Sequence, residues 1–415
     1  MTRKIADAQL LSAAALVLPP LGFLAPLGIA PLLTLVALVL IALAPRARLA
    51  QVKPFRPLAI LLALLSLWGA LSALWSTIPA HSLFESGRLA LISASGIVAA
   101  AAALSLDDAG KAKIGHAGIA GLGLGIIVAL VERWGGFPLH HLISGSATDR
   151  EYEFAALDRG AVALAIISWI TIRHLMLQRR HIGAGLVFAA VSLTLLQLVS
   201  HSALLGFAFA AASFALGWWW PRLVAAAFAI GFAALTVAMP LIHPTRGVII
   251  WLHDALPALR FSALHRIAIW RFASDRIAEH PFLGWGMDAS RELPDGKTEV
   301  RYFLQLPLDT FDSLRGAVMP LHPHDAILQW WLELGIVGAL LGLAIFAWTV
   351  WRTRRWAAAP RVVRATGLAL IAAALPPLLL DFGVWQAWWQ STLWFAAAFA
   401  LAVGTGAMPV ARSGD

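Results

Sequence analysis

The chain has 415 residues, of which 60% are hydrophobic and only 13% are charged. A water-soluble domain of this length needs far more polar surface, so the composition excludes an ordinary soluble protein and makes lipid the relevant solvent. The apolar runs are about 17–25 residues long and rich in Ala and Leu, which is the length of spanning helices and not of barrel strands. The chain has no Cys, so no disulfide can stabilise it.

We predict about twelve membrane-spanning helices. In chain order they cover residues 6–24, 27–45, 57–76, 87–105, 114–132, 160–176, 183–199, 203–219, 223–240, 325–350, 362–380 and 385–405. Because no convincing small-residue cleavage site precedes the second run, we expect the first run to be retained as a helix and not removed as a signal peptide. Prolines at 19, 20, 376 and 377 fall inside two of these helices, where kinks are expected.

Loop charge predicts the orientation in the membrane. The loops on the side of the two termini carry 18 Lys and Arg residues, whereas the shorter loops opposite carry only Arg88, Arg133, Arg150 and Arg159. By the positive-inside rule, both termini are cytoplasmic. The net charge of +9 therefore lies mainly where it meets anionic lipid head groups, and it does not indicate nucleic acid binding.

The expected fold is an all-α integral membrane protein with one large loop on the non-cytoplasmic side that carries short amphipathic helices. Nine spanning helices are expected in residues 1–240, the loop in 241–323 and three more helices in 324–415. A connection of this length is usually functional. The loop contains nine basic and nine acidic residues, so any anionic ligand must be bound by individually placed Arg side chains and not by bulk charge.

Two histidines lie where the large loop ends and a membrane helix begins. Pro323 suits a position near a helix start, which would place His324 at a helix N-terminus whose positive end disfavours imidazolium. A neutral imidazole can accept a proton and act as a general base. The alternative is that His322 and His324 only cap the helix or meet lipid head groups. Two residues apart, they do not easily point into one site from a regular helix, so a metal site is only weakly indicated.

Two carboxylates follow the histidines. Glu333 lies nine residues after His324, which is about 13.5 Å along a helix axis and too far to orient that imidazole. Intramembrane carboxylates are often functional, but a buried structural hydrogen bond is the role we expect for Glu333. Asp325 is close enough to orient a histidine or to cap the helix.

Residues 264–279 have the pattern of an amphipathic helix on the outer membrane surface, which His280-Pro281 should end. Arg266 and Arg271 are about 140° apart around such a helix, so they should not grip the same phosphate. Arg271 has Asp275 one turn on, which makes a local ion pair its default role. Arg266 has no such partner and shares a side with Trp270, so it either binds an anion or extends to lipid phosphate.

Two further arginines lie at similar depth on the outer side. Arg159, in Asp158-Arg159-Gly160, either meets a phosphate or pairs with Asp158, and Arg88 is equally ambiguous. His201 and Ser202 lie in a very short outer turn, where packing or capping is expected. The chain has no Walker-type phosphate loop, no dinucleotide fingerprint and no HExxH zinc motif.

Taken together, these residues resemble the O-antigen ligase family and the related O-antigen polymerases. The landmarks are residues 158–165, 200–206, the stretch from Arg266 through Trp270 to 280–286, residues 322–325 with Glu333-Leu334-Gly335, and Trp385–Trp389. Asp325 departs from the pattern, because the family usually shows Asn there, and His201 stands where many members carry a different polar or basic residue.

The resemblance implies a membrane glycosyltransferase that moves a preassembled glycan from undecaprenyl pyrophosphate to lipid A-core, on the periplasmic face of the bacterial inner membrane. It implies that His324 is the general base and that Arg266 and Arg159 bind pyrophosphate. The remaining candidates for substrate binding are Arg88, His322, Trp270 and Arg271. No cofactor or metal is expected, and the partners are the two amphiphilic substrates and membrane lipids. The alternatives are an O-antigen polymerase and, more distantly, a transporter, for which we find no internal repeat.

Overall fold

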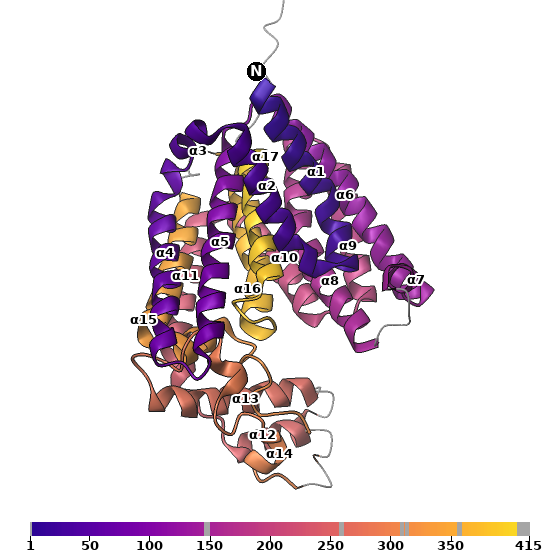
Figure 1. Ribbon diagram of the computed structural model, residues 1–415. Helices are drawn as coiled ribbons and strands as arrows, with labels where there is room; N and C mark the ends of the chain where they lie inside the picture. The colour runs from indigo at the N-terminus through magenta and orange to yellow at the C-terminus, as the bar shows by residue number, and fades with distance from the viewer. Residues whose placement is uncertain are drawn as a thin grey trace, which may run out of the picture.

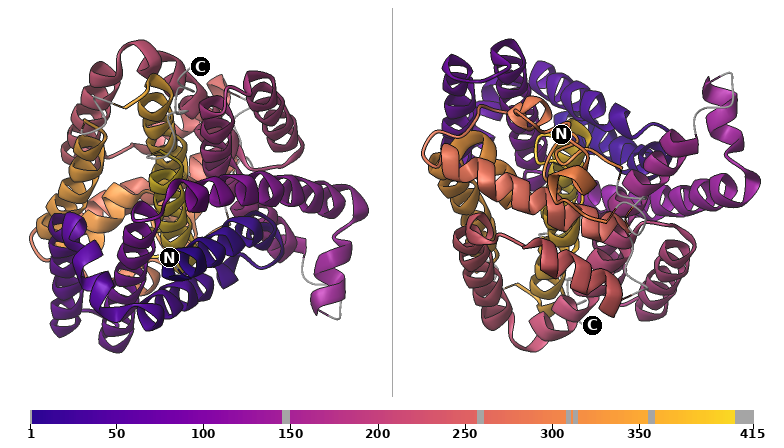
Figure 2. Two further views of the ribbon diagram at one scale, coloured as in Figure 1. Left: turned by 90° about the horizontal axis from the view of Figure 1, so that it is seen from above. Right: turned by 90° about the horizontal axis from the view of Figure 1, so that it is seen from below.

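The structure is a computed structural model that describes residues 2–144, 150–256, 261–307, 311, 315–354 and 359–404. Long helices form a bundle, and short helices with their connecting loops cover the end of the bundle that lies opposite the N-terminus (Figure 1). We refer to this end, which carries the described residues between 241 and 325, as the loop end. Seen along the bundle, α17 (Ala387–Gly404) runs through the middle, in contact with α2, α5 and α8 (Figure 2).

The first part of the chain forms eleven α-helices with short 3-10 turns between some of them. Their bounds are α1 (Thr2–Leu24), η1 (Pro26–Gly28), α2 (Ile29–Leu43), α3 (Pro45–Gln51), η2 (Lys53–Phe55), α4 (Arg56–Leu71), η3 (Ser72–Leu74), α5 (Pro79–Leu104), α6 (Asp108–Gly135), α7 (Pro138–Ser144), α8 (Arg150–Leu177), α9 (His181–Gln197), α10 (His201–Trp219) and α11 (Pro221–Ala238). The loop end and the last long helices follow as η4 (Met239–Leu241), α12 (Arg246–Ala255), α13 (Phe261–Glu279), η5 (Ala289–Glu292), α14 (Val300–Phe303), α15 (Ala326–Arg354), α16 (Arg361–Leu380) and α17.

Ten of the described helices are long and apolar enough to cross a membrane. Helix α9 is apolar but has only 17 residues, and α17 with 18 residues is not among the ten. Leu35, Leu38 and Ile230 point outward on spanning helices, where a bilayer and not water is the fitting solvent. The chain is therefore an all-α, multi-pass membrane protein, and the count of twelve spans stays a prediction.

Local sequence explains where several helices begin. Asp107, Ser200 and Thr245 accept backbone N–H groups at the N-caps of α6, α10 and α12. Helices α5 and α11 each begin with a proline, which has no N–H to leave unpaired in the first turn.

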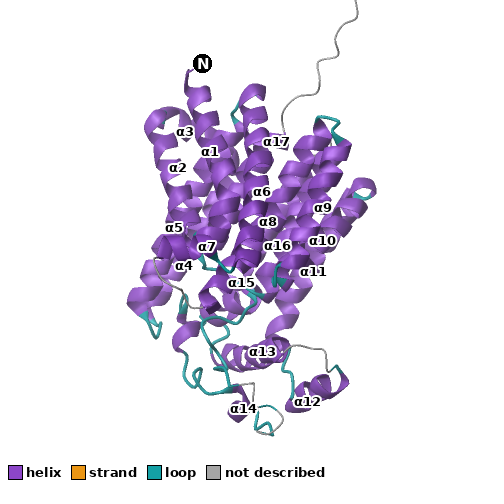
Figure 3. Cartoon of the chain, turned by 90° about the vertical axis from the view of Figure 1, so that its right-hand side faces the viewer, coloured by secondary structure: helices purple, strands orange, loops and turns teal. Residues whose placement is uncertain are grey.

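Helix α13 lies across the loop end, between the bundle and the more distant α12 and α14 (Figure 3). It ends at Glu279, directly before His280-Pro281, as the sequence predicts. Its apolar face does not rest on lipid alone, which corrects one expectation: Ala273 and Ile277 are buried in the protein, where α13 packs against α15 and η4. Protein contacts fix this helix more firmly than a lipid surface would.

Helix α15 is broken at Gly335, which has a φ of +63°. A Cβ at this position would lie 2.2 Å from the carbonyl oxygen of Phe282, so only glycine fits. The break opens the helix to the segment 281–286, because the N–H groups of Trp285 and Gly286 donate to the carbonyls of Leu332 and Glu333. The glycine break thus fixes the loop segment against the start of α15.

Candidate active site

Asp381, which follows α16 directly, joins three distant segments of the chain at the loop end. Its Oδ1 accepts a hydrogen bond from Nη2 of Arg266 on α13 at 3.1 Å. Its Oδ2 accepts from the hydroxyl of Ser202, in the first turn of α10, at 2.6 Å. Its backbone carbonyl accepts from Nδ1 of His324 at 2.5 Å. A single residue therefore positions both an arginine and a histidine.

The bond to the carbonyl fixes the tautomer of His324. A carbonyl oxygen can only accept, so Nδ1 must carry the proton and Nε2 presents a lone pair in the neutral ring. Burial lowers the pKa of His324, and the charge of Arg266 lowers it further, against the opposing effect of the Asp381 carbonyl. None of the described residues hydrogen-bonds Nε2, which leaves that atom able to take a proton.

Burial keeps His324 neutral, whereas the sequence predicts that the positive end of a helix does so. The helix begins only at Ala326, with Asp325 as its cap, so His324 precedes the helix and owes its lowered pKa mainly to burial. Its φ of +54° is left-handed, a conformation that costs free energy for a residue other than glycine. Such strain at a histidine is typical of a functional position.

His322 and His324 share one site, contrary to the prediction from helical spacing. Their ring centroids are 4.4 Å apart, because neither lies on a helix. Nδ1 of the buried His322 accepts the backbone N–H of His324 at 3.2 Å, which supports the left-handed turn. Burial places the pKa of His322 well below its usual value, and neighbouring His324, Arg291 and Arg266 lower it further.

The histidine turn is held at both ends. Nε1 of Trp270 on α13 donates to the carbonyl of Pro323 at 3.1 Å. Oδ1 of Asp325 accepts the N–H of Leu328 at 2.8 Å, so this carboxyl caps α15 and does not orient a histidine. Burial raises the pKa of Asp325 to about 7.

Arg266 has an ion-pair partner that the sequence did not reveal. The pair with Asp381 uses only Nη2, and the rest of this half-buried guanidinium makes no hydrogen bond to the described residues. The sequence predicts only that Arg266 lacks a partner one turn along its own helix, and Asp381 comes from another helix end. A carboxylate that holds one edge of a guanidinium presents the other edge in a fixed direction.

Arg159 lies on the same side of the molecule, with its guanidinium 5.9 Å from the ring centroid of Trp388. Its neighbour Asp158 hydrogen-bonds Ser200 and interacts electrostatically with Asp381 and Arg266. The Asp158-Arg159 segment therefore belongs to the surroundings of Asp381.

Arg271 and Arg88 have other partners. Arg271 donates to the carbonyl of Pro244 at 3.2 Å and lies 3.9 Å from the carboxylate of Asp275, so it has the local pairing that its spacing predicts. Arg88 lies inside α5 and donates to the carbonyl of Trp385 at 3.0 Å. Among the described residues, neither of them hydrogen-bonds Asp381, His324 or Arg266, although Arg88 contacts the loop that supplies Asp381.

Glu333 is a buried hub that fixes the loop between α16 and α17. It accepts hydrogen bonds from the backbone N–H of Asp288 (2.7 Å), the hydroxyl of Ser290 (2.5 Å), the amide of Gln329 (3.0 Å) and the indole of Trp385. Four donors to one carboxylate satisfy it fully, so its arrangement agrees with the structural role expected.

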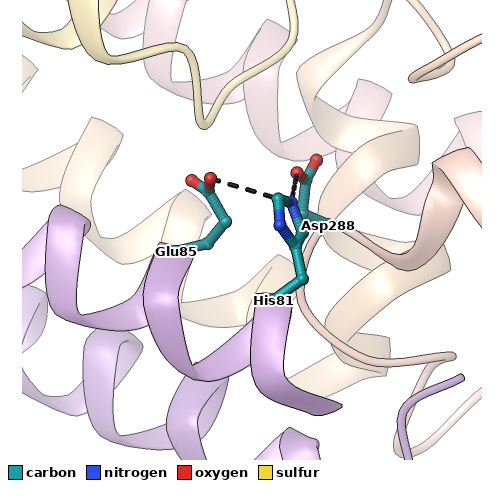
Figure 4. A group of neighbouring side chains, drawn as sticks. All are labelled: His81, Glu85 and Asp288. Carbon is teal, nitrogen blue, oxygen red and sulfur yellow. Dashed lines mark hydrogen bonds and ion pairs between the residues drawn. The ribbon is translucent and has the colours of Figure 1, made fainter. Parts of the chain in front are cut away.

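The sequence reasoning missed Asp381 and assigned Ser202 only to packing or capping. One sequence feature pointed to Asp381: its carboxylate ends an apolar helix on the side of the membrane that carries His324. An unpaired charge there would be costly, so a cationic partner could be expected. The described residues also contain one group with metal-ligand chemistry, His81, Glu85 and Asp288, which lies outside the Asp381 group (Figure 4).

The fold and this site define a class: a multi-pass membrane protein that gathers a neutral histidine, an arginine and a carboxylate at one end of its bundle. Comparison with known proteins agrees. Residues 184–343, which include Arg266 and His324, match the model of a family described as O-antigen ligase.

Three rickettsial proteins, each named "Putative polysaccharide ligase", are 27% identical to this chain. The protein of Rickettsia conorii aligns over 60% of this chain and 58% of its own length. Those of Rickettsia typhi and Rickettsia prowazekii align over 68% of this chain and 66% of their own length. The chain thus spans about three-fifths to two-thirds of these relatives, and the matches together support its assignment to the O-antigen ligase family.

Proposed function

We propose that this protein is a membrane glycosyltransferase that transfers an O-antigen glycan from undecaprenyl pyrophosphate to lipid A-core. The observation that carries the proposal is the attachment of His324 and Arg266 to the same residue, Asp381. Such a site offers a proton acceptor and a fixed positive charge side by side, which are the two groups that this transfer needs.

The reaction follows from those two groups. Nε2 of His324 accepts the proton of an acceptor hydroxyl as its oxygen bonds to the anomeric carbon of the donor sugar. The bond from that carbon to the pyrophosphate oxygen breaks, and undecaprenyl pyrophosphate leaves with the electron pair. Arg266 and Arg159 stabilise the negative charge that grows on the leaving group.

The support around Arg266 suits a transition state with developing charge. Asp381 fixes one edge of the Arg266 guanidinium in advance, and Ser202 in turn holds the Asp381 carboxylate. Little reorganisation is therefore needed when negative charge develops on the leaving group. Trp270, held on the carbonyl of Pro323, would border the route by which lipid substrates enter from the bilayer. No step requires a nucleotide, because the donor already carries its leaving group.

The loop end would face the periplasm and both termini the cytoplasm of a bacterial inner membrane. This orientation rests on the excess of Lys and Arg in the loops on the side of the termini. Both substrates would then reach the site from the outer leaflet.

The test is transfer in vitro with purified protein, a carrier-linked glycan and lipid A-core. The expected product is glycosylated lipid A-core, formed equally with and without EDTA. Lengthening of the carrier-linked glycan without lipid A-core would indicate a polymerase instead. Loss of transfer in EDTA that added metal restores would contradict the mechanism, and transport into vesicles without transfer would contradict the enzyme class.

Deletion of the gene separates ligase from polymerase in the cell. Loss of a ligase leaves bare lipid A-core while carrier-linked polymer accumulates, whereas loss of a polymerase leaves a single repeat on lipid A-core. The first phenotype is the one expected.

A further inference from the structure

A second charged cluster lies at the loop end, between α5 and the segment that follows Gly286. His81 and Glu85 are one turn apart on α5, and both face Asp288 of that segment (Figure 4). Nε2 of His81 is 2.7 Å from Oδ2 of Asp288 and 3.7 Å from Oε1 of Glu85. The cluster therefore ties a spanning helix to the loop.

Two arginines complete this cluster. Arg88 is ion-paired with Glu85, and Nη2 of Arg291 is 2.5 Å from Oδ2 of Asp288. Both carboxylates are buried, whereas the side chains of His81, Arg88 and Arg291 are exposed by 35%, 32% and 35%. The anionic groups thus lie beneath a surface formed by two arginines and a histidine.

The charges favour an anionic ligand over a metal ion. The ligand atoms of His81, Glu85 and Asp288 lie within 4.8 Å of one another, a spacing that a divalent cation could use. Each carboxylate is already neutralised by a guanidinium, however, so a cation would have to displace both arginines from buried partners. An anion needs no such change, because it can bind the outward edges of both guanidinium groups.

The position of Arg88 indicates where this anion comes from. His81, Phe84, Arg88 and Leu91 follow one another at spacings of three and four residues, so they share one face of α5. Phe84 and Leu91 are exposed on this membrane-spanning helix, which means that the face meets lipid. A ligand that reaches Arg88 along this face is an amphiphile with an anionic head group.

The cluster also adjoins the Asp381 group. Arg88 donates to the carbonyl of Trp385, in the same loop that supplies Asp381. After burial and the neighbouring His324, the charges of Arg291 and Arg266 both contribute to the low pKa of His322, so the two arginines act on one histidine. A molecule bound at Arg88 and Arg291 would therefore lie beside the reacting groups.

We propose that Arg88 and Arg291, held in place by Glu85 and Asp288, bind a phosphate group of the lipid-anchored acceptor. This inference rests on the proposed function, in which Arg266 holds the pyrophosphate of the donor. Guanidinium suits the task because its planar donors match two phosphate oxygens at once. Two separate phosphate sites would hold the two amphiphiles on either side of His324.

The kinetic test compares lipid A-core acceptor with and without its phosphate groups. In Arg88→Gln and Arg291→Gln, the KM for the phosphorylated acceptor should rise by roughly tenfold or more, while the KM for the donor stays unchanged. With the dephosphorylated acceptor, variants and wild type should have the same KM. Equal losses with both acceptors would show that the arginines are only structural and would overturn the proposal.

Two further variants guard against misfolding and general charge effects. Arg88→Lys keeps a charge beside Glu85 but loses the planar donor pair, so it should fold and still show a raised KM. Arg133→Gln removes an arginine in the last turn of α6, where it stacks on Trp134. This variant should leave the KM for the phosphorylated acceptor unchanged. A wild-type KM in Arg88→Lys together with a raised one in Arg133→Gln would contradict a specific site.

A binding measurement separates this inference from the proposed function. Native mass spectrometry would count the lipids retained by the protein from phosphatidylcholine nanodiscs that contain phosphorylated acceptor, dephosphorylated acceptor or phosphatidylglycerol. Wild type should retain the phosphorylated acceptor and Arg88→Gln should lose it, even if no transfer occurs in any assay. Equal retention of phosphatidylglycerol would overturn the assignment to the acceptor, and Mn²⁺ binding that His81→Ala abolishes would identify a cation site instead.

Discussion

Nδ1 of His324 donates a hydrogen bond to the backbone carbonyl of Asp381 at 2.5 Å, and the carboxylate of the same Asp381 accepts from Arg266. The tautomer of the histidine and the direction of the guanidinium are thus set together, at the point where α16 ends. The two effects use different atoms of Asp381, so substitution of its side chain can separate them.

Asp381→Asn should weaken catalysis without changing the tautomer of His324. The amide lacks the charge that holds Arg266, whereas the backbone carbonyl still accepts from Nδ1. We expect kcat/KM to fall by roughly 10- to 100-fold, the usual effect of losing an orienting partner. The acid limb of the pH profile should move to lower pH, because the charge of Asp381 helps to raise the pKa of His324 and the amide lacks it. Ser202→Ala removes one hydroxyl donor to the same carboxylate but leaves its charge and its pair with Arg266, so it should cost less. An acid limb that moves to higher pH in Asp381→Asn would contradict this account of the two roles.

His324→Ala should abolish transfer while the protein remains folded and inserted, because the only atom assigned to accept the proton is removed. His322→Ala should keep measurable activity, since His322 supports the turn through the backbone N–H of His324. Transfer rate and the elution profile on size exclusion would be measured for both variants. An inactive His322→Ala beside an active His324→Ala would move the base to His322.

The dependence of the rate on pH should reflect the lowered pKa of His324. As the pH falls through this pKa, Nε2 takes up a proton and can no longer act as a base, so kcat/KM falls. Because burial places the pKa below the usual 6.5, the acid limb of the pH profile should be centred below pH 6.5. An acid limb centred at or above pH 6.5 would contradict the neutral, buried histidine.

Arg266→Lys should be severely impaired although the charge is kept. A lysine offers no planar pair of donors, so it cannot hold Asp381 on one side and two phosphate oxygens on the other. We expect a loss of roughly a hundredfold in kcat, comparable to removal of one donor to a developing negative charge. Arg276→Lys is the matched control on the same helix, because Arg276 pairs with Glu279. Comparable losses in both variants would indicate damage to α13 and not loss of a ligand contact.

Asp325→Asn should preserve the fold and the activity, because an amide oxygen can also cap α15. Folding raises the pKa of this carboxyl to about 7, so the folded state binds its proton more tightly than the unfolded state does. Stability from this group is therefore present below pH 3.8 and lost as the pH rises through about 7.

Asp325→Asn has no carboxyl to ionise, so its stability does not fall as the pH rises through about 7. It should be more stable than wild type above pH 7, and the difference should be smaller at pH 5. Asp325→Ala, which removes the cap, should cost about 1 kcal/mol. Thermal unfolding at the two pH values would measure both effects, and an Asn variant that is less stable at pH 8 than at pH 5 relative to wild type would contradict the argument.

Part of the candidate site could be read from local patterns. The helix at 264–279 was predicted from its apolar spacing and its terminating His-Pro pair, and α13 covers Phe261–Glu279. The local pairing of Arg271 with Asp275 followed in the same way, because both lie on one helix. The partner of Arg266 did not follow, since Asp381 lies 115 residues further along the chain.

By itself, the sequence determined that this is a helical membrane protein, because the length and hydrophobicity of each run decide whether it spans a bilayer. It also pointed to His324 and Arg266 as the residues with chemistry to offer. Only the tertiary structure decided that both meet at Asp381, that His324 presents Nε2, and that a glycine break in α15 fixes the neighbouring loop. These features depend on which helix ends come together, and that is set by packing between segments far apart in the chain, which no local pattern records.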